Sequence, residues 1–232
     1  MQCVGSARAW CRLALAGIFA AVPGQSLLHA ADVHARLVPL TPLKLAGSAV
    51  IWLEPVQRTS GSAVAPGKFT LLQKNKTFTP HLLVVPVGSS IAFPNADPFF
   101  HNVFSLFDGK RFDLGLYEAG STRSVVFSRE GVSYIFCNIH SEMSAVVIAL
   151  DTSFYSIADQ HGTFRLTGIP DGNYVLHVWA EGQPQSSLDQ LTKRVHVTGA
   201  DVNLGDIHAG KAKQEHLNKF GQHYDPNAAP TY

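Results

Sequence analysis

Sulfur is scarce in this chain, which has three cysteines and two methionines among 232 residues. Met1, Cys3 and Cys11 lie at the extreme N-terminus, so Cys137 and Met143 are the only sulfur-bearing side chains of all that follows. A single cysteine cannot form an intrachain disulfide, and in an oxidising compartment a lone thiol is a liability unless it is buried or bound. The core must therefore come from the burial of apolar side chains alone.

Strong charge and long apolar runs are also missing. The formal net charge is +1, and this near-neutral balance argues against a nucleic-acid partner, which needs a basic surface. The first thirty residues combine Arg8 and Arg12 with the short apolar run "LALAGIFAAV", a pattern typical of a secretory signal peptide cleaved after Ala30. No later run reaches the length of a transmembrane helix. We therefore expect a soluble protein, exported to the periplasm or secreted.

Most of the remaining chain carries strand signals, with little that favours helices. Short segments rich in β-branched and aromatic residues alternate with turn sequences such as "FDGK", "YEAGS" and "PDGN". These segments are 48–54, 90–95, 102–107, 123–128, 132–137, 144–150, 163–168, 173–180 and 194–199. The spacing predicts an all-β protein built as a sandwich or barrel, followed by a polar tail over 210–232.

The stretch "FCNIHSEM" (136–143) places a thiol, an imidazole and a thioether three residues apart. In a strand, Cys137 and His140 would point to opposite faces, and in a helix Cys137 and Met143 would be about 9 Å apart along the axis. A loop between two strands brings all three together, and strand-like runs flank the stretch on both sides. The spacing therefore indicates a metal-binding loop.

The donor types favour copper. Two histidines and a cysteine, with a weak axial methionine, form the blue-copper electron-transfer pattern. The second histidine must come from elsewhere, and His101 in "NADPFFHNVFSL" is the candidate. Other interpretations stay open: a zinc site made by His101, Cys137 and His140, a Cys137–His140 nucleophile and base, or a buried core cysteine. The first two leave Met143 without a role.

The segments "FTPHLLVVPVGSSIAFPNADPFFHNVFS" and "FCNIHSEM" resemble the cupredoxins, and the short C-x-x-H-x-x-M loop is most similar to that of amicyanin. The resemblance implies a Greek-key β-sandwich with His101, Cys137 and His140 as equatorial ligands of one type 1 copper and Met143 as the axial ligand. It also implies that Asn102 tethers the ligand loop by hydrogen bonds. Glu142 is a departure that could lower the reduction potential or change which partner docks.

The whole chain after the leader resembles exported bacterial proteins labelled as methylamine utilisation proteins, which join a cupredoxin-like domain to a transthyretin-like or carboxypeptidase-regulatory-like sandwich. We expect the cupredoxin-like domain over 69–150. Neither flank alone has enough strands to close a sandwich, so we expect 31–68 and 151–209 to pair as one discontinuous second sandwich.

The function expected from this resemblance is electron transfer, with no enzymatic activity of its own. His140 would form an exposed edge through which electrons pass to a redox partner such as a cytochrome or a dehydrogenase. The alternatives are a copper carrier or sensor, and a metal-free interaction module. A second metal site is not predicted from the other histidines, which we place on strands, in turns or in the tail: His81, His161, His177, His196, His208, His216 and His223.

Overall fold

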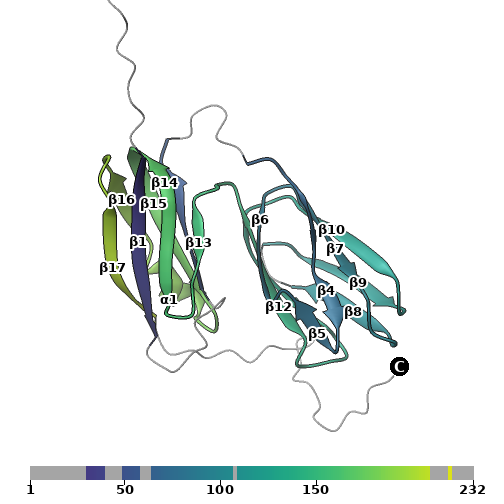
Figure 1. Cartoon of the computed structure of the whole chain (residues 1–232). Helices are drawn as coiled ribbons and strands as arrows, with labels where there is room; N and C mark the ends of the chain where they lie inside the picture. Colours follow the sequence, from purple (N-terminus) through teal and green to yellow (C-terminus); the bar gives the residue numbers. More distant parts are fainter. Residues whose placement is uncertain (1–29, 40–48, 58–63, 107–108, 210–218, 221–232) are drawn as a thin grey trace, which may run out of the picture.

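A computed structural model describes residues 30–39, 49–57, 64–106, 109–209 and 219–220 (Figure 1). These residues form β-strands almost throughout, and the short helix α1 (Gln185–Asp189) is the single helix among them. The predicted all-β class is therefore confirmed. No helix in these ranges is long and apolar enough to cross a membrane. The predicted signal peptide, apart from Ala30, and the predicted tail, apart from Lys219 and Phe220, lie outside the described residues.

The strands make two sandwiches that lie side by side (Figure 1). In chain order they are β1 (Ala30–Pro39), β2 (Ala49–Pro55), β3 (Lys68–Thr70), β4 (Leu72–Lys74), β5 (Thr77–Thr79), β6 (Leu82–Pro86), β7 (Ser89–Pro94), β8 (His101–Ser105), β9 (Phe112–Tyr117), β10 (Thr122–Phe127), β11 (Gly131–Phe136), β12 (Ser144–Leu150), β13 (Tyr155–Ile157), β14 (Thr163–Pro170), β15 (Gly172–Ala180), β16 (Lys193–Val197) and β17 (Val202–Ala209).

The flanking sandwich, as we call the first of them, consists of a β14-β1-β17 sheet and a β13-β2-β15-β16 sheet. Both early strands occupy interior positions: β1 is antiparallel to β14 and parallel to β17, and β2 lies between β13 and β15. The β2–β15 register runs from Ala49 opposite Ala180 to Pro55 opposite Tyr174. Segments from the two ends of the chain thus complete the same sheets. That they form a separate folding domain remains a prediction.

The central sandwich, residues 68–150, has a β10-β7-β3 sheet and a β6-β12-β11-β8-β9 sheet, with a β4-β5 hairpin at one end. Its core consists mainly of aliphatic and aromatic side chains from both sheets, including Ile91, Phe93, Val103 and Ile135. Cys137 and Met143 also belong to this core. The end of the sandwich where β8 begins and β11 ends is therefore both apolar and rich in candidate ligands.

Strand β12 is buried on both faces, which explains its unbroken apolar sequence "SAVVIAL". Ala145, Val147 and Ala149 face the core of the central sandwich. The intervening Val146, Ile148 and Leu150 pack in the core cluster that includes Trp179 and the other buried residues of the flanking sandwich. A strand covered on both sides reads as a continuous hydrophobic run rather than as an alternating one. The two sandwiches therefore share an apolar interface.

Polar contacts reinforce this interface. The indole Nε1 of Trp179 donates to the Tyr134 hydroxyl at 3.1 Å, and His81 lies 2.6 Å from a carboxylate oxygen of Glu181. His81 also lies 3.1 Å from the carbonyl oxygen of Ser144, the first residue of β12. The flanking sandwich is thus bonded to the strand that directly follows the candidate metal-binding loop.

Candidate metal centre

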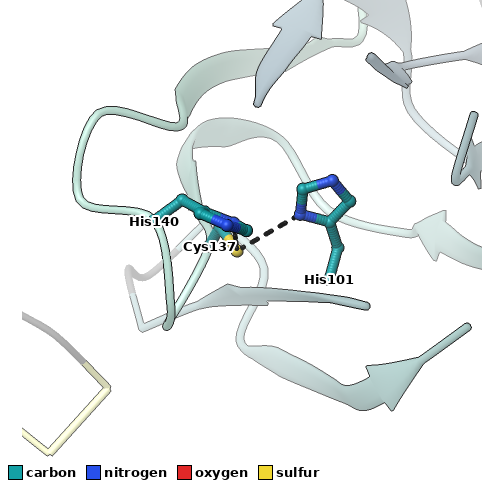
Figure 2. A group of neighbouring side chains, drawn as sticks. All are labelled: His101, Cys137 and His140. Atoms are coloured by element: carbon teal, nitrogen blue, oxygen red, sulfur yellow. Dashed lines mark hydrogen bonds between the residues drawn. The ribbon is translucent and has the colours of Figure 1, made fainter. Parts of the chain in front are cut away.

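Three residues that the sequence singles out converge at one end of the central sandwich (Figure 2). His101 is the first residue of β8, Cys137 follows the last residue of β11, and His140 lies in the loop between β11 and β12. One potential ligand atom from each lies within 4.8 Å of the other two. All three are buried, and their exposed fractions are 0%, 0% and 8%. Their role as metal ligands remains a prediction.

The distances fit a shared ion. The Cys137 Sγ atom lies 3.8 Å from Nδ1 of His101 and 3.6 Å from Nδ1 of His140. A metal about 2.3 Å from sulfur and about 2.0 Å from nitrogen, with trigonal to tetrahedral angles, separates the two donor atoms by roughly 3.5–3.8 Å. Figure 2 shows the His101 ring with one nitrogen facing the Cys137 sulfur and the His140 ring beside it. The two sulfur–nitrogen distances therefore match those of two imidazoles that share one small cation with the thiolate.

The loop owes its shape to main-chain hydrogen bonds. The β11–β12 ladder ends at the Phe136–Ser144 pair, so Cys137 and Met143 are the next residues on either side of the connection. Cys137 N–H donates to the Met143 carbonyl at 3.2 Å, and Met143 N–H donates to the His140 carbonyl at 3.0 Å. The two three-residue spacings therefore form one compact turn between two strands, as the sequence predicts.

Met143 is fully buried in the apolar core of the central sandwich, next to the candidate ligands in the chain. A thioether inside a dry core can provide a weak, soft ligand without introducing a charge. The residue directly precedes β12 and follows His140 by three positions. Its axial role remains a prediction.

Burial sets the protonation of the candidate ligands. It lowers the pKa of His140 to about 4, and the nearby His101 and Lys76 act in the same direction. Burial also lowers the pKa of His101, although the hydrogen bond to Asp97 opposes it. Both imidazoles are therefore neutral near pH 7, which is the state that a metal ligand requires.

The thiol of Cys137 is subject to two opposing effects. Burial raises its pKa, while hydrogen bonding by the backbone N–H groups of Asn102, Ile139 and His140 works against this increase. Without a cation the residue stays a thiol at neutral pH, and a bound metal must displace its proton. The three N–H groups are already placed to stabilise the thiolate that results.

Asn102 contacts the site through its main chain. Its backbone N–H favours the Cys137 thiolate, whereas its side-chain amide donates to Asp113 on β9 at 2.7 Å. Within the described part of the chain, the Asn102 Oδ1 atom is buried without a hydrogen-bond partner. The side-chain bond leads to β9 and away from the loop that carries Cys137 and His140, so that a tether to this loop would use the backbone N–H. That Asn102 tethers the ligand loop remains a prediction.

The expectation that His140 forms an exposed edge is wrong, because the side chain is 8% exposed and its Nε2 atom is buried. The ring of Phe99 lies 5.6 Å from the His140 ring and 5.3 Å from the His101 ring, centroid to centroid. Phe100, the other member of the aromatic pair, is 41% exposed. Phe99 therefore belongs to the wall of the site, and Phe100 faces outward beside it.

Sequence reasoning missed Asp97 and Lys76. The Asp97 carboxylate lies 2.8 Å from Nε2 of His101, and the Lys76 ammonium lies 5.4 Å from the centre of the Phe99 ring. Burial opposes the ionisation of Asp97, but hydrogen bonds from Lys76, His101 and Asn75 outweigh it and hold its pKa below the usual range. The available signal was the four-residue spacing between an acid and a candidate ligand.

The other histidines have structural contacts of their own. His177 stacks on Trp52 with ring centroids 5.1 Å apart, and His196 lies 2.9 Å from an oxygen of Asn173. His208, expected in a turn or the tail, lies in β17. Among the residues that the structure describes, His101, Cys137 and His140 form the single group of three side chains that could hold a metal ion.

Comparisons with known proteins find similarity among solved cupredoxin structures. A purple cupredoxin from Nitrosopumilus maritimus is 25% identical, with 35% of this chain and 98% of that one covered and a TM-score of 0.32. A reduced amicyanin variant is 19% identical over 43% of this chain and 98% of that one, with a TM-score of 0.33. A copper-containing nitrite reductase from Thermus scotoductus SA-01 is 22% identical over 49% of this chain and 28% of that one, with a TM-score of 0.35. No protein-family model and no curated protein sequence matches the chain.

Proposed function

We propose that this protein is an exported type 1 copper protein that carries single electrons between redox partners. The observation that carries the proposal is the buried triangle formed by His101 Nδ1, Cys137 Sγ and His140 Nδ1. A soft thiolate with two imidazoles suits copper, and the thioether of Met143 at the end of the same loop suits copper better than zinc.

Bound at this site, copper would supply one-electron chemistry by alternating between Cu(II) and Cu(I). The protein's own contribution is to hold the donor atoms in one arrangement for both states. His101 is fixed by its place at the start of β8, and Cys137 and His140 are fixed by the hydrogen-bonded turn between β11 and β12. A site that moves little between oxidation states exchanges electrons with little reorganisation.

Burial keeps the site dry. Cys137 and Met143 have no exposed surface, and Phe99 packs against both imidazoles. Phe100, next to His101 in the chain, exposes an aromatic side chain at this end of the sandwich. We propose that a redox protein, such as a cytochrome or a dehydrogenase, receives or delivers the electron at this end.

The test is a copper titration of the purified exported chain, followed by visible absorption and voltammetry. We expect one copper per chain, an intense visible band from the thiolate–copper bond, and a reversible one-electron wave. His101→Gln should remove the band, while the matched control His196→Gln, at an exposed histidine bonded to Asn173, should keep it.

Other outcomes separate the alternatives. Tight Cu(I) binding without an intense band would indicate a copper carrier or sensor, and no stoichiometric copper would indicate a metal-free interaction module. Preferential binding of zinc with no role for Met143 would indicate a zinc site. A new N-terminus after Ala30 in the exported protein would establish the predicted cleavage and localisation.

A further inference from the structure

Asp97 is a buried carboxylate with an unusual set of donors. It is 5% exposed, and it lies in the connection between β7 and β8, four residues before His101. Its Oδ1 accepts from Asn75 N–H at 2.6 Å, and its Oδ2 accepts from Lys76 N–H at 2.9 Å. A buried carboxylate is costly unless its oxygens are hydrogen-bonded. The two main-chain donors meet that requirement without help from the imidazole.

The same Oδ2 atom lies 2.8 Å from Nε2 of His101, on the far side of the ring from the Cys137 thiol. A carboxylate can only accept, so Nε2 of the neutral ring must carry the proton. Nδ1 is then left with a free lone pair, directed at the position where the three candidate ligand atoms converge. Asp97 therefore presents His101 in the tautomer that a metal needs.

We propose that Asp97 is a positioning residue, which fixes the tautomer and the ring orientation of His101 and, through its negative charge, favours Cu(II) over Cu(I) at the site. The second half of this inference rests on the proposed copper function. A carboxylate that accepts a hydrogen bond from the nitrogen that does not bind the metal makes a ligating imidazole more basic. A more basic ligand stabilises the more highly charged ion.

The surrounding backbone holds the carboxylate in place. Asn75 and Lys76 form the β4–β5 turn with positive φ angles of 55° and 57°, and both N–H groups point at Asp97. On the other side, Asp97 N–H donates to Asn95 Oδ1 at 3.0 Å, and Asn95 Nδ2 donates to the Phe99 carbonyl at 2.7 Å. The carboxylate is thus braced from a hairpin and from its own loop, so its position does not depend on the imidazole.

The first test uses the copper-free protein and is independent of the proposed function. Nitrogen NMR of histidine-labelled wild-type protein should show His101 as the Nε2–H tautomer with a slowly exchanging proton. Asp97→Asn should speed that exchange or mix the tautomers, and Asp159→Asn should not. Asp159 is a matched control because its carboxylate also accepts two main-chain N–H groups, from His161 and Thr163, in the flanking sandwich. A wild-type Nδ1–H tautomer would overturn the proposal even if the variant fails to fold.

The second test uses the copper-loaded protein. Asp97→Asn should weaken Cu(II) binding relative to Cu(I) by about 10-fold to 100-fold, the usual effect of removing a ligand's hydrogen-bonding partner. Each tenfold change corresponds to about 59 mV in a one-electron potential, so the potential should rise. Glu142→Gln removes an exposed charge two residues from His140. This variant should raise the reduction potential less than Asp97→Asn does, because solvent screens the charge. Equal shifts in the two variants would refute the charge effect.

The two tests fail in different ways. If the wild-type protein binds no copper, the proposed function is wrong, while the NMR measurement still decides whether Asp97 sets the tautomer. If copper binds with an intense band but Asp97→Asn changes neither the exchange of the Nε2 proton nor the potential, the proposed function stands and the role of Asp97 is refuted.

Discussion

The two sandwiches differ in how many polar side chains they bury. Of the eleven buried polar side chains among the described residues, nine lie in the central sandwich and two, Thr152 and Gln183, lie outside it. The flanking sandwich keeps its charges at the surface, as in the exposed Arg36–Asp206 pair. Buried polar groups cost stability unless they are hydrogen-bonded. Four of the nine, Asp97, His101, Asn102 and His140, lie at the end of the central sandwich that carries the candidate ligands.

The largest expected effect separates the two sandwiches themselves. A fragment of residues 151–209 lacks β1 and β2, which each hold an interior position in one sheet of the flanking sandwich, so we expect it to be unfolded by circular dichroism. Adding residues 31–67 should restore folding. A fragment of residues 68–151 keeps every strand of the central sandwich and should fold and bind copper.

That central fragment should also self-associate, because it exposes the face of β12 formed by Val146, Ile148 and Leu150. Sedimentation or light scattering checks this point. Cooperative thermal unfolding of 151–209 on its own would contradict the discontinuous arrangement.

Cys137→Ser should remove the intense visible band of the copper-loaded protein completely, because that transition requires a bond between the metal and a thiolate. The circular dichroism spectrum should stay that of a β-protein, since serine is smaller than cysteine and the fold contains no disulfide at this residue. Retention of the band in the variant would exclude Cys137 as a ligand.

Leu176→Ala should affect stability without affecting the site. Leu176 is fully buried in the flanking sandwich, and removing such a side chain costs about 2–5 kcal/mol in the free energy of unfolding. Urea denaturation measures this loss, and the visible spectrum of the folded variant should match that of the wild type. A changed spectrum would show that the flanking sandwich shapes the metal centre directly.

Substitutions at Met143 should change the reduction potential of the copper-loaded protein and keep its intense visible band. Met143→Gln should lower the reduction potential, because a harder oxygen donor favours Cu(II), and Met143→Leu should raise it. Voltammetry of the three proteins under the same conditions provides the comparison. Three identical potentials would make Met143 a core residue only.

The smallest effect is expected at the surface of the flanking sandwich. Arg36 donates to both carboxylate oxygens of Asp206, but both side chains are exposed and solvent screens their attraction. Arg36→Ala should leave the midpoint of thermal unfolding unchanged within error, with wild type measured beside it. A large decrease would mean that this pair anchors β1 to β17.

The spacing of Cys137, His140 and Met143 was enough to predict a turn between two strands, because a strand or a helix would hold side chains at this spacing too far apart to share one ion. His101 required a further clue, its place at the head of a strand after an aromatic pair. The strand β1 was not predicted, because its buried positions alternate small and branched side chains (Ala31, Val33, Ala35 and Leu37) next to an apolar leader.

Two features of the site depend on contacts between distant segments, so the sequence could not reveal them. The donors that hold Asp97 come from the Asn75–Lys76 turn, more than twenty residues earlier in the chain. The burial of His140 depends on how the ligand loop and the segment carrying Phe99 pack together in three dimensions. Periodicity and spacing report which residues share a face, but they do not report what covers that face.

The interior position of β1 has a consequence for the order of folding. Arg36 and its partner Asp206 are 170 positions apart, whereas every strand that β11 and β12 pair with lies between residues 82 and 150. Contacts that close long loops form late, because the chain entropy they must overcome grows with loop length. We expect the central sandwich to fold while β1 and β2 still lack partners, and to bring the two flanking segments of the chain together as it does so. The candidate metal centre would then be complete before the last strands of the protein are in place.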